Sequence, residues 1–153
     1  MSYRSQVKVR FGEIDRAGIA YFPNLYHYCH VAFEDFFEEH LGVSYPDLIE
    51  KERIGFPTVR VESYFKTPIR YGDVLEISVA LTRVGTSSAT FEFRANRVGD
   101  RALCFASVHI VVCVEMETFR PVRIPERYRE IFLRAGAEDG PARESGEEDL
   151  GAS

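Results

Sequence analysis

Residues 23–42 read PNLYHYCHVAFEDFFEEHLG, and this stretch decides the fold. Its large apolar side chains recur at alternating spacings of three residues and one, which is the pattern of one face of an α-helix. Pro23 suits the first helical position, and Gly42 suits the position just beyond the last turn. The predicted apolar face consists of Leu25, Tyr28, Cys29, Ala32, Phe33, Phe36 and Phe37. A helix with so broad an aromatic face needs a sheet to cover it.

The sequence on both sides of this helix alternates between apolar and polar residues, with the period of a β-strand. We predict strands within residues 6–11, 59–71, 75–81, 89–95 and 101–114, and a short last helix over 125–135. Turn sequences at 71–73 and 84–86 favour antiparallel neighbours. The expected fold is therefore α+β, with one long central helix wrapped by a five-stranded antiparallel sheet.

The charge of the chain is unevenly distributed. The net charge is −5 over 153 residues, yet residues 136–153 alone carry six acidic residues and one arginine. The remainder is neutral, with 18 acidic and 18 basic residues, and therefore has no basic excess to bind nucleic acid. The last 18 residues are also poor in large apolar side chains. We expect a single domain over 1–135 and an acidic disordered tail over 136–153.

Cysteine usage and hydropathy indicate a cytoplasmic protein. The three cysteines form an odd set without a Cys-x-x-Cys pair, which argues against disulfides and a thiolate zinc site. The longest apolar run, 108–114, is too short to span a bilayer, and no signal peptide precedes the first strand. Neither a histidine pair with metal-ligand spacing nor a glycine-rich phosphate loop is present. We expect no metal, no cofactor and no membrane span.

The segment FGEIDRAGIAYFPN at 11–24 is the best candidate for catalysis. It places Asp15 on a glycine-bordered loop shortly before the long helix. The helix N-terminus offers unpaired N–H groups and the positive end of the helix dipole, both of which suit a developing oxyanion. A carboxylate beside an oxyanion site is what transfer of an acyl group to water requires. The alternative is that Asp15 is a turn or capping residue, because aspartate is common in loops.

Three segments and the aromatic helix resemble the 4-hydroxybenzoyl-CoA thioesterase family. The segments are FGEIDRAGIAYFPN at 11–24, GFPTV at 55–59 and YGDVLEI at 71–77, and the resemblance covers residues 5–130. It implies the hot-dog fold and hydrolysis of acyl-CoA thioesters. It also implies dimers that pair their sheets edge to edge, as homodimers or homotetramers.

The resemblance implies catalytic roles for three residues. Asp15 falls on the catalytic aspartate of the family, as nucleophile or general base. Phe22 falls on the position whose N–H polarises the thioester carbonyl, and Tyr21 lies beside it. Glu13 is interpreted as loop electrostatics rather than as a second catalyst.

The resemblance also implies an acyl site that contains Tyr26, Pro57 and Thr58. His30 departs from the family, which often has an acidic residue there. It lies on an aromatic ridge with Tyr26 and Phe33, where it could contact the acyl group. The alternative is a partly buried histidine satisfied by the backbone. For the phosphates of CoA, the resemblance suggests Arg83, Ser87 and Ser88, with other arginines left open.

The remaining candidates have simpler interpretations. Cys29 lies in the middle of the apolar stripe and is expected to be an inert buried thiol. His27 is expected on the surface, and His109 as a core histidine with satisfied hydrogen bonds. A hot-dog dehydratase would have a histidine on the loop before the helix, and a non-catalytic acyl-CoA-binding protein would lack the carboxylate. Asp15 therefore favours an acyl-CoA thioesterase for an aromatic or a short to medium acyl group.

Overall fold

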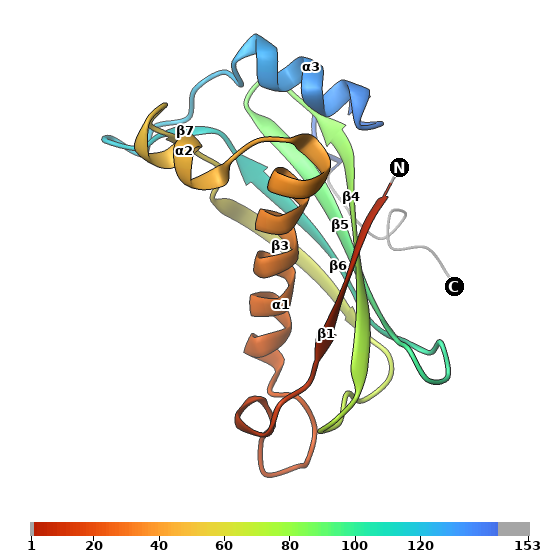
Figure 1. Cartoon of the computed structure of the whole chain (residues 1–153). Helices are drawn as coiled ribbons and strands as arrows, with labels where there is room; N and C mark the ends of the chain where they lie inside the picture. Colours follow the sequence, from red (N-terminus) through yellow and green to blue (C-terminus); the bar gives the residue numbers. More distant parts are fainter. Residues whose placement is uncertain (1, 144–153) are drawn as a thin grey trace.

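The computed structural model describes residues 2–143, and its long helix lies in the hollow of a curved antiparallel sheet (Figure 1). Helix α1 (Phe22–Asp35) continues as a wider turn, η2 (Phe36–Leu41), and ends at Gly42. Gly42 has φ 70°, a left-handed conformation that glycine adopts without strain. The predicted arrangement of one long helix wrapped by a sheet is confirmed.

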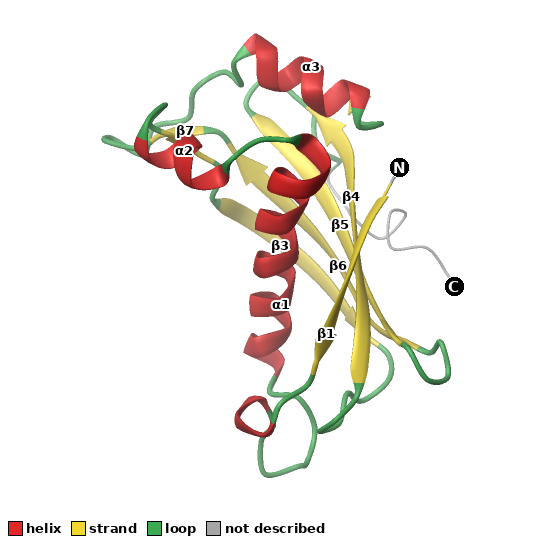
Figure 2. Cartoon of the chain, in the orientation of Figure 1, coloured by secondary structure: helices red, strands yellow, loops and turns green. Residues whose placement is uncertain are grey.

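The order of the main strands is β1-β4-β5-β6-β3, and all four pairings along this path are antiparallel (Figure 2). These strands are β1 (Ser2–Lys8), β4 (Val74–Val84), β5 (Ser88–Arg97), β6 (Leu103–Val112) and β3 (Thr58–Phe65). The smaller elements are η1 (Phe11–Glu13), α2 (Tyr45–Glu50), α3 (Glu126–Arg134), the pair β2 (Ile54–Gly55) and β7 (Val114–Glu115), and β8 (Glu138–Asp139). Strands β1 and β3 form the two edges of the main path. None of the helices within residues 2–143 is long and apolar enough to cross a membrane.

The core is formed by the aromatic face of α1 and η2 against the inner faces of β4 and β5. All seven residues of the predicted apolar face are buried, and the alternating apolar residues of β4 and β5 are buried opposite them. The rings of Phe33 and Phe91 lie 4.9 Å apart between centroids, and Phe36 packs edge-on against Phe91. Burial of each such side chain contributes about 1.5–3 kcal/mol, and an aromatic pair adds about 0.5–1.5 kcal/mol.

Two predicted boundaries differ from the structure, and one short helix was not predicted. The first strand is β1, where Val7 pairs with Leu75, and the chain leaves the sheet after Lys8 to form η1. The predicted strand 59–71 stops at Phe65 because a turn precedes Pro68, which has no N–H to donate to a ladder. Helix α2 was not predicted, since its six residues are too few to show a helical period.

The acidic end of the chain is part of the fold as far as the structure describes it. Residues 144–153 of the predicted disordered tail lie outside the described residues. In the described part, Ala137 is buried and β8 pairs in parallel with the end of β4. Arg83 contacts Glu138 at 3.3 Å, and Arg129 contacts Asp139. The domain boundary expected at residue 135 therefore shifts beyond β8.

This docking predicts different outcomes for two truncations. Removing residues 137–153 deletes β8 and its two ion pairs, whose acidic side chains are exposed. The ion pairs and the backbone bonds of β8 together stabilise the folded protein by about 1–2 kcal/mol. We expect Tm to fall by about 2–6 °C. The matched truncation that removes only 144–153 should leave Tm unchanged. Equal Tm values for both truncations, measured by calorimetry, would contradict a stabilising role of β8.

Candidate active site

The loop that carries Asp15 is a closed turn in front of α1. Ile14 and Ala20 form a bridge, and Asp15 N–H donates to the Ile19 carbonyl at 3.0 Å. Gly18 has φ 79° and donates its N–H to the Asp15 carbonyl at 3.0 Å. The Asp15 side chain is exposed, and its Oδ1 accepts from Ala17 N–H at 2.8 Å. The carboxylate is thus oriented by the turn, while no hydrogen bond from residues 2–143 engages its second oxygen.

Glu13 fixes this loop to the helix. Its Oε1 accepts from the Tyr28 hydroxyl at 2.7 Å and from Arg10 N–H at 2.8 Å. Its carbonyl accepts from Tyr21 N–H and from the Asn24 amide, both at 2.9 Å. Burial, and then the bond to Glu13, raise the pKa of Tyr28. The interpretation of Glu13 as loop electrostatics missed this role, because the partner residue lies in the helix, two turns beyond its start.

The start of α1 lies directly after this loop. Tyr21 is the residue before the first helical turn, and Pro23 occupies its second position. In the first turn Pro23 has no N–H and the Asn24 N–H donates to the Tyr21 carbonyl at 2.8 Å, while the Phe22 N–H lies at the positive end of the helix dipole. The side chains of Tyr21 and Phe22 are half exposed, with ring centroids 5.7 Å apart. The closed loop that carries Asp15 therefore leads directly into the N-terminus of α1.

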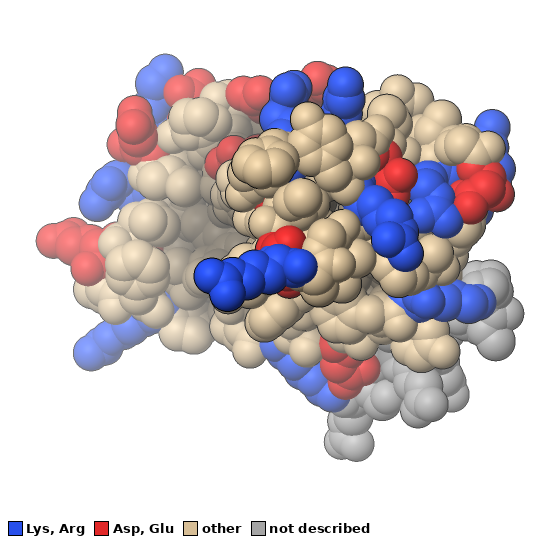
Figure 3. All heavy atoms as spheres, turned by 90° about the horizontal axis from the view of Figure 1, so that it is seen from below, with Lys and Arg blue, Asp and Glu red and all other residues tan. Residues whose placement is uncertain are grey.

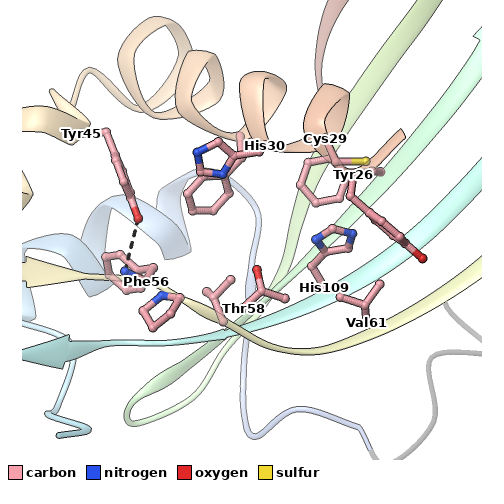
Figure 4. Close-up of a pocket in the computed structure, with 12 residues that line it drawn as sticks. Tyr26, Cys29, His30, Tyr45, Phe56, Thr58, Val61 and His109 are labelled. Atoms are coloured by element: carbon pink, nitrogen blue, oxygen red, sulfur yellow. Dashed lines mark hydrogen bonds between the residues drawn. The ribbon is translucent and has the colours of Figure 1, made fainter. Parts of the chain in front are cut away.

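A cavity of about 320 Å³ opens between the flank of α1 and strands β3 and β6 (Figure 4). Four of the predicted substrate-binding residues, Tyr26, His30, Pro57 and Thr58, line it. The other lining residues are Cys29, Phe33, Tyr45, Phe56, Val61, Phe93, His109 and Val111. Its walls are largely aromatic and apolar, with few polar groups, which is the usual character of a site for an organic ligand.

His30 lies at the exposed side of this cavity. Its side chain is 61% exposed and lies 3.7 Å from the Glu34 carboxylate, one helical turn further on. Its ring stacks on Phe33 with centroids 6.2 Å apart. The alternative of a partly buried histidine satisfied by the backbone is therefore wrong, and His30 is free to meet a ligand at the cavity mouth.

His109 lies on the inner wall of the same cavity. It is 9% exposed and packs against the ring of Phe93, with centroids 4.6 Å apart, and against Tyr26 at 6.0 Å. Burial lowers the pKa of His109 to about 4, so the ring is neutral at neutral pH. Its Nε2 is buried without a hydrogen-bond partner in the described part of the chain. The prediction of a core histidine with satisfied hydrogen bonds is wrong.

Cys29 and His27 match their interpretations. Cys29 is 2% exposed, and burial raises the pKa of its thiol, so it stays protonated and inert. His27 is exposed and lines neither large cavity. Among residues 2–143, no group of three or more His, Cys, Asp or Glu side chains lies together as metal ligands would.

A second cavity, also of about 320 Å³, lies at the N-terminal end of α1. It is lined there by Phe22 and Leu25, and on the side of β3 by Phe65 and Pro68. Asp15 lines neither this cavity nor the one beside His109. Along α1, Phe22 and His30 are separated by eight residues, or about 12 Å of helix. Within one chain, neither Asp15 nor Phe22 lines the aromatic cavity, which begins at Tyr26, one turn beyond Phe22.

The residues proposed for the CoA phosphates lie away from both cavities. Arg83 is at the end of β4 and contacts Glu138, while Ser87 and Ser88 lie at the hairpin between β4 and β5. The Ser87 carbonyl accepts from Cys113 N–H at 2.7 Å. Figure 3 shows the opposite end of the molecule, where basic and acidic side chains are interspersed around a hollowed, uncharged surface. The structure does not bring these three residues to Asp15.

Comparisons with known proteins agree on one family. Residues 9–132 match the family model described as the thioesterase-like superfamily. A relative named 1,4-dihydroxy-2-naphthoyl-CoA hydrolase, from Synechococcus elongatus, is 28% identical over 129 residues, which cover 84% of this chain and 93% of the relative. A solved gentisyl-coenzyme A thioesterase is 28% identical with a TM-score of 0.76, covering 85% of this chain and 99% of that one.

A further solved structure is similar in fold and contains a substrate. It is a 4-hydroxybenzoyl-CoA thioesterase with an aspartate replaced by asparagine, in complex with 4-hydroxybenzoyl-CoA. It is 25% identical to this chain with a TM-score of 0.79, and the match covers 85% of this chain and 97% of that one. These likenesses confirm the hot-dog fold that the sequence predicts.

The bond between Tyr28 and Glu13 predicts that Tyr28→Phe loosens the Asp15 loop. The variant keeps the buried ring and removes one partly buried hydrogen bond to a carboxylate. We expect a free energy of unfolding lower by about 1–2 kcal/mol and faster hydrogen exchange at the Asp15 and Gly18 amides. Tyr128→Phe is the matched control, because it removes a tyrosine–glutamate bond, to Glu52, away from this loop and should leave the exchange at Asp15 and Gly18 unchanged. Unchanged exchange in Tyr28→Phe would show that Glu13 does not hold the loop.

Proposed function

The chain belongs to the thioesterase-like superfamily, and on that basis we propose that it hydrolyses the thioester of an aromatic acyl-CoA to the free acid and CoA. The observation that carries the proposal is Asp15, which a closed turn holds directly before the N-terminus of α1 and of which only one carboxylate oxygen is hydrogen-bonded within residues 2–143. The three cysteines are buried and form no disulfide with one another, which supports a location in the cytoplasm as part of the proposal.

The proposed reaction uses one carboxylate and one N–H. The Phe22 N–H at the start of α1 donates to the thioester oxygen and stabilises the negative charge that develops there. Asp15 either attacks the carbonyl carbon, forming an anhydride that water cleaves, or takes a proton from the attacking water. In both routes the carbon–sulfur bond breaks, the thiolate leaves as CoA, and water supplies the oxygen of the acid. Tyr21 positions Phe22 through its backbone bond to Glu13.

The aromatic character of the acyl group is supported by two observations. The cavity beside α1 has walls of aromatic side chains and a size of about 320 Å³, which suits one or two rings. The three relatives described above are named for naphthoyl, gentisyl and hydroxybenzoyl thioesters. In this proposal Tyr26, Pro57 and Thr58 contact the ring, and His30 lies at the entrance.

We also propose that the active unit is a dimer formed by pairing of β3 with β3 of a second copy. Strand β3 is an edge strand whose Val59 and Phe65 are 61% and 54% exposed, and an exposed apolar edge favours pairing with another strand. The cavity lies at the Thr58 end of β3, and the helix start lies at the Phe65 end.

Antiparallel pairing of two identical strands about a two-fold axis places opposite ends side by side. The start of α1 and the Asp15 loop of one copy would then lie beside the aromatic cavity of the other. This arrangement accounts for the separation of Asp15 from the cavity within one chain. We further propose that two dimers associate into a tetramer. The proposal also keeps Arg83, Ser87 and Ser88 as the residues that hold the phosphates of CoA.

Asp15→Asn tests the proposed chemistry. The amide keeps the acceptor for Ala17 N–H, so the turn should stay intact, but it removes the nucleophile or base. We expect kcat for an aryl-CoA to fall by about 10²-fold or more, with Tm unchanged. The assay is release of the free CoA thiol.

Asp47→Asn is the matched control, because Asp47 is an exposed aspartate in the first turn of α2. It should retain the turnover of the unchanged protein. If Asp15→Asn retained that turnover as well, the assignment of the catalytic carboxylate would be wrong.

A further inference from the structure

Two buried side-chain atoms in the described part of the chain lack a hydrogen-bond partner, Thr90 Oγ1 and His109 Nε2. Of the two residues, His109 lines the aromatic cavity. The ring is 91% buried, and Figure 4 shows it between the flank of α1 and strand β3. An unpaired polar atom in such a place disfavours folding, and most buried polar atoms in proteins have partners.

The hydroxyl groups of the two tyrosines in the cavity wall are already engaged. The Tyr26 hydroxyl is bonded to Ser63 Oγ at 2.9 Å, and the Tyr45 hydroxyl accepts from Phe56 N–H at 3.3 Å. Around His109 the wall is apolar, formed by Phe93, Val61 and Val111 among others. Apart from the Thr58 hydroxyl at the start of β3, the His109 imidazole is therefore the polar group of this wall that can contact a ligand.

The protonation state of His109 restricts what it can recognise. Because burial holds its pKa at about 4, the imidazole is neutral, and one ring nitrogen donates while the other accepts. A neutral imidazole in an apolar wall suits a hydroxyl group, which can either donate to Nε2 or accept from it. A negatively charged substituent would have to be desolvated there without a compensating charge.

We propose that His109 is a specificity-determining residue that hydrogen-bonds a hydroxyl group on the aromatic ring of the acyl substrate. The inference rests on the proposed function, and it concerns the inner end of the cavity rather than its mouth. His30, at the mouth, is largely exposed and would contact the substrate in water. His109 therefore contributes more to discrimination, because it is buried in the cavity wall and makes its contact in apolar surroundings.

The test compares benzoyl-CoA with its 2-, 3- and 4-hydroxy derivatives in His109→Phe. Phenylalanine keeps an aromatic ring in the wall and removes both ring nitrogens. For at least one hydroxybenzoyl-CoA, kcat/KM should fall by about 3- to 10-fold relative to benzoyl-CoA, the loss expected for one net hydrogen bond. Tm should rise or stay the same, since an unpaired buried polar atom is removed. His27→Phe, an exposed histidine outside the cavity, should leave the ratio unchanged.

The outcomes separate this role from the function on which it rests. If the unchanged protein hydrolyses benzoyl-CoA and His109→Phe leaves all ratios the same, the role of His109 is refuted while the hydrolase stands. A lower Tm with a uniform loss on all four substrates would also refute it, because that is the result for a packing residue.

A second measurement does not require turnover. In the unchanged protein, the imidazole ¹⁵N resonances of His109 should shift when at least one of the three hydroxybenzoate isomers binds. They should not shift when benzoate binds. Equal shifts for all four acids would contradict the hydrogen bond, whether or not the thioesters are hydrolysed.

Discussion

Burial of the aromatic face of α1 against the concave side of the sheet is the interaction on which the rest of the structure depends. The C-terminal part of the helix packs against Phe91 on β5 through the rings of Phe33, Phe36 and Phe37. With that face fixed, the helix has no freedom to rotate. Its N-terminus must meet the loop that carries Asp15, and its flank with Tyr26 must face β3 and β6. The position of the proposed chemistry follows from the packing of the core.

The site is built where this packing is incomplete. The flank of α1 opposite β3 leaves a cavity of about 320 Å³ rather than a filled core, and Nε2 of the buried His109 in its wall has no hydrogen-bond partner among the described residues. Each of these features costs stability, which proteins tolerate at functional sites. By contrast, hydrogen bonds to Glu13 and the closed turn hold the loop in front of the helix, so that Asp15 is oriented before a substrate arrives.

Sequence reasoning succeeded where the information is local. Helical and strand periods reflect the burial of one face, so they predicted α1 and the inner strands with their buried residues. It failed where contacts join distant segments. The bond from Tyr28 to Glu13, the docking of β8 on β4 and the missing partner of His109 depend on which elements meet in space. A short helix such as α2 has too few residues to show a period.

The most direct test of the account is complementation between two inactive variants. One variant is Asp15→Asn, which keeps the cavity, and the other is Pro57→Trp, which fills the cavity from a position just before β3 and keeps Asp15. Mixed dimers should contain one site with an open cavity and an intact Asp15 loop, so that aryl-CoA hydrolysis returns when the unfolded chains are mixed and refolded together. If every mixture stayed as inactive as its parents while the unchanged protein refolded to full activity, the claim that two copies share one site would be wrong.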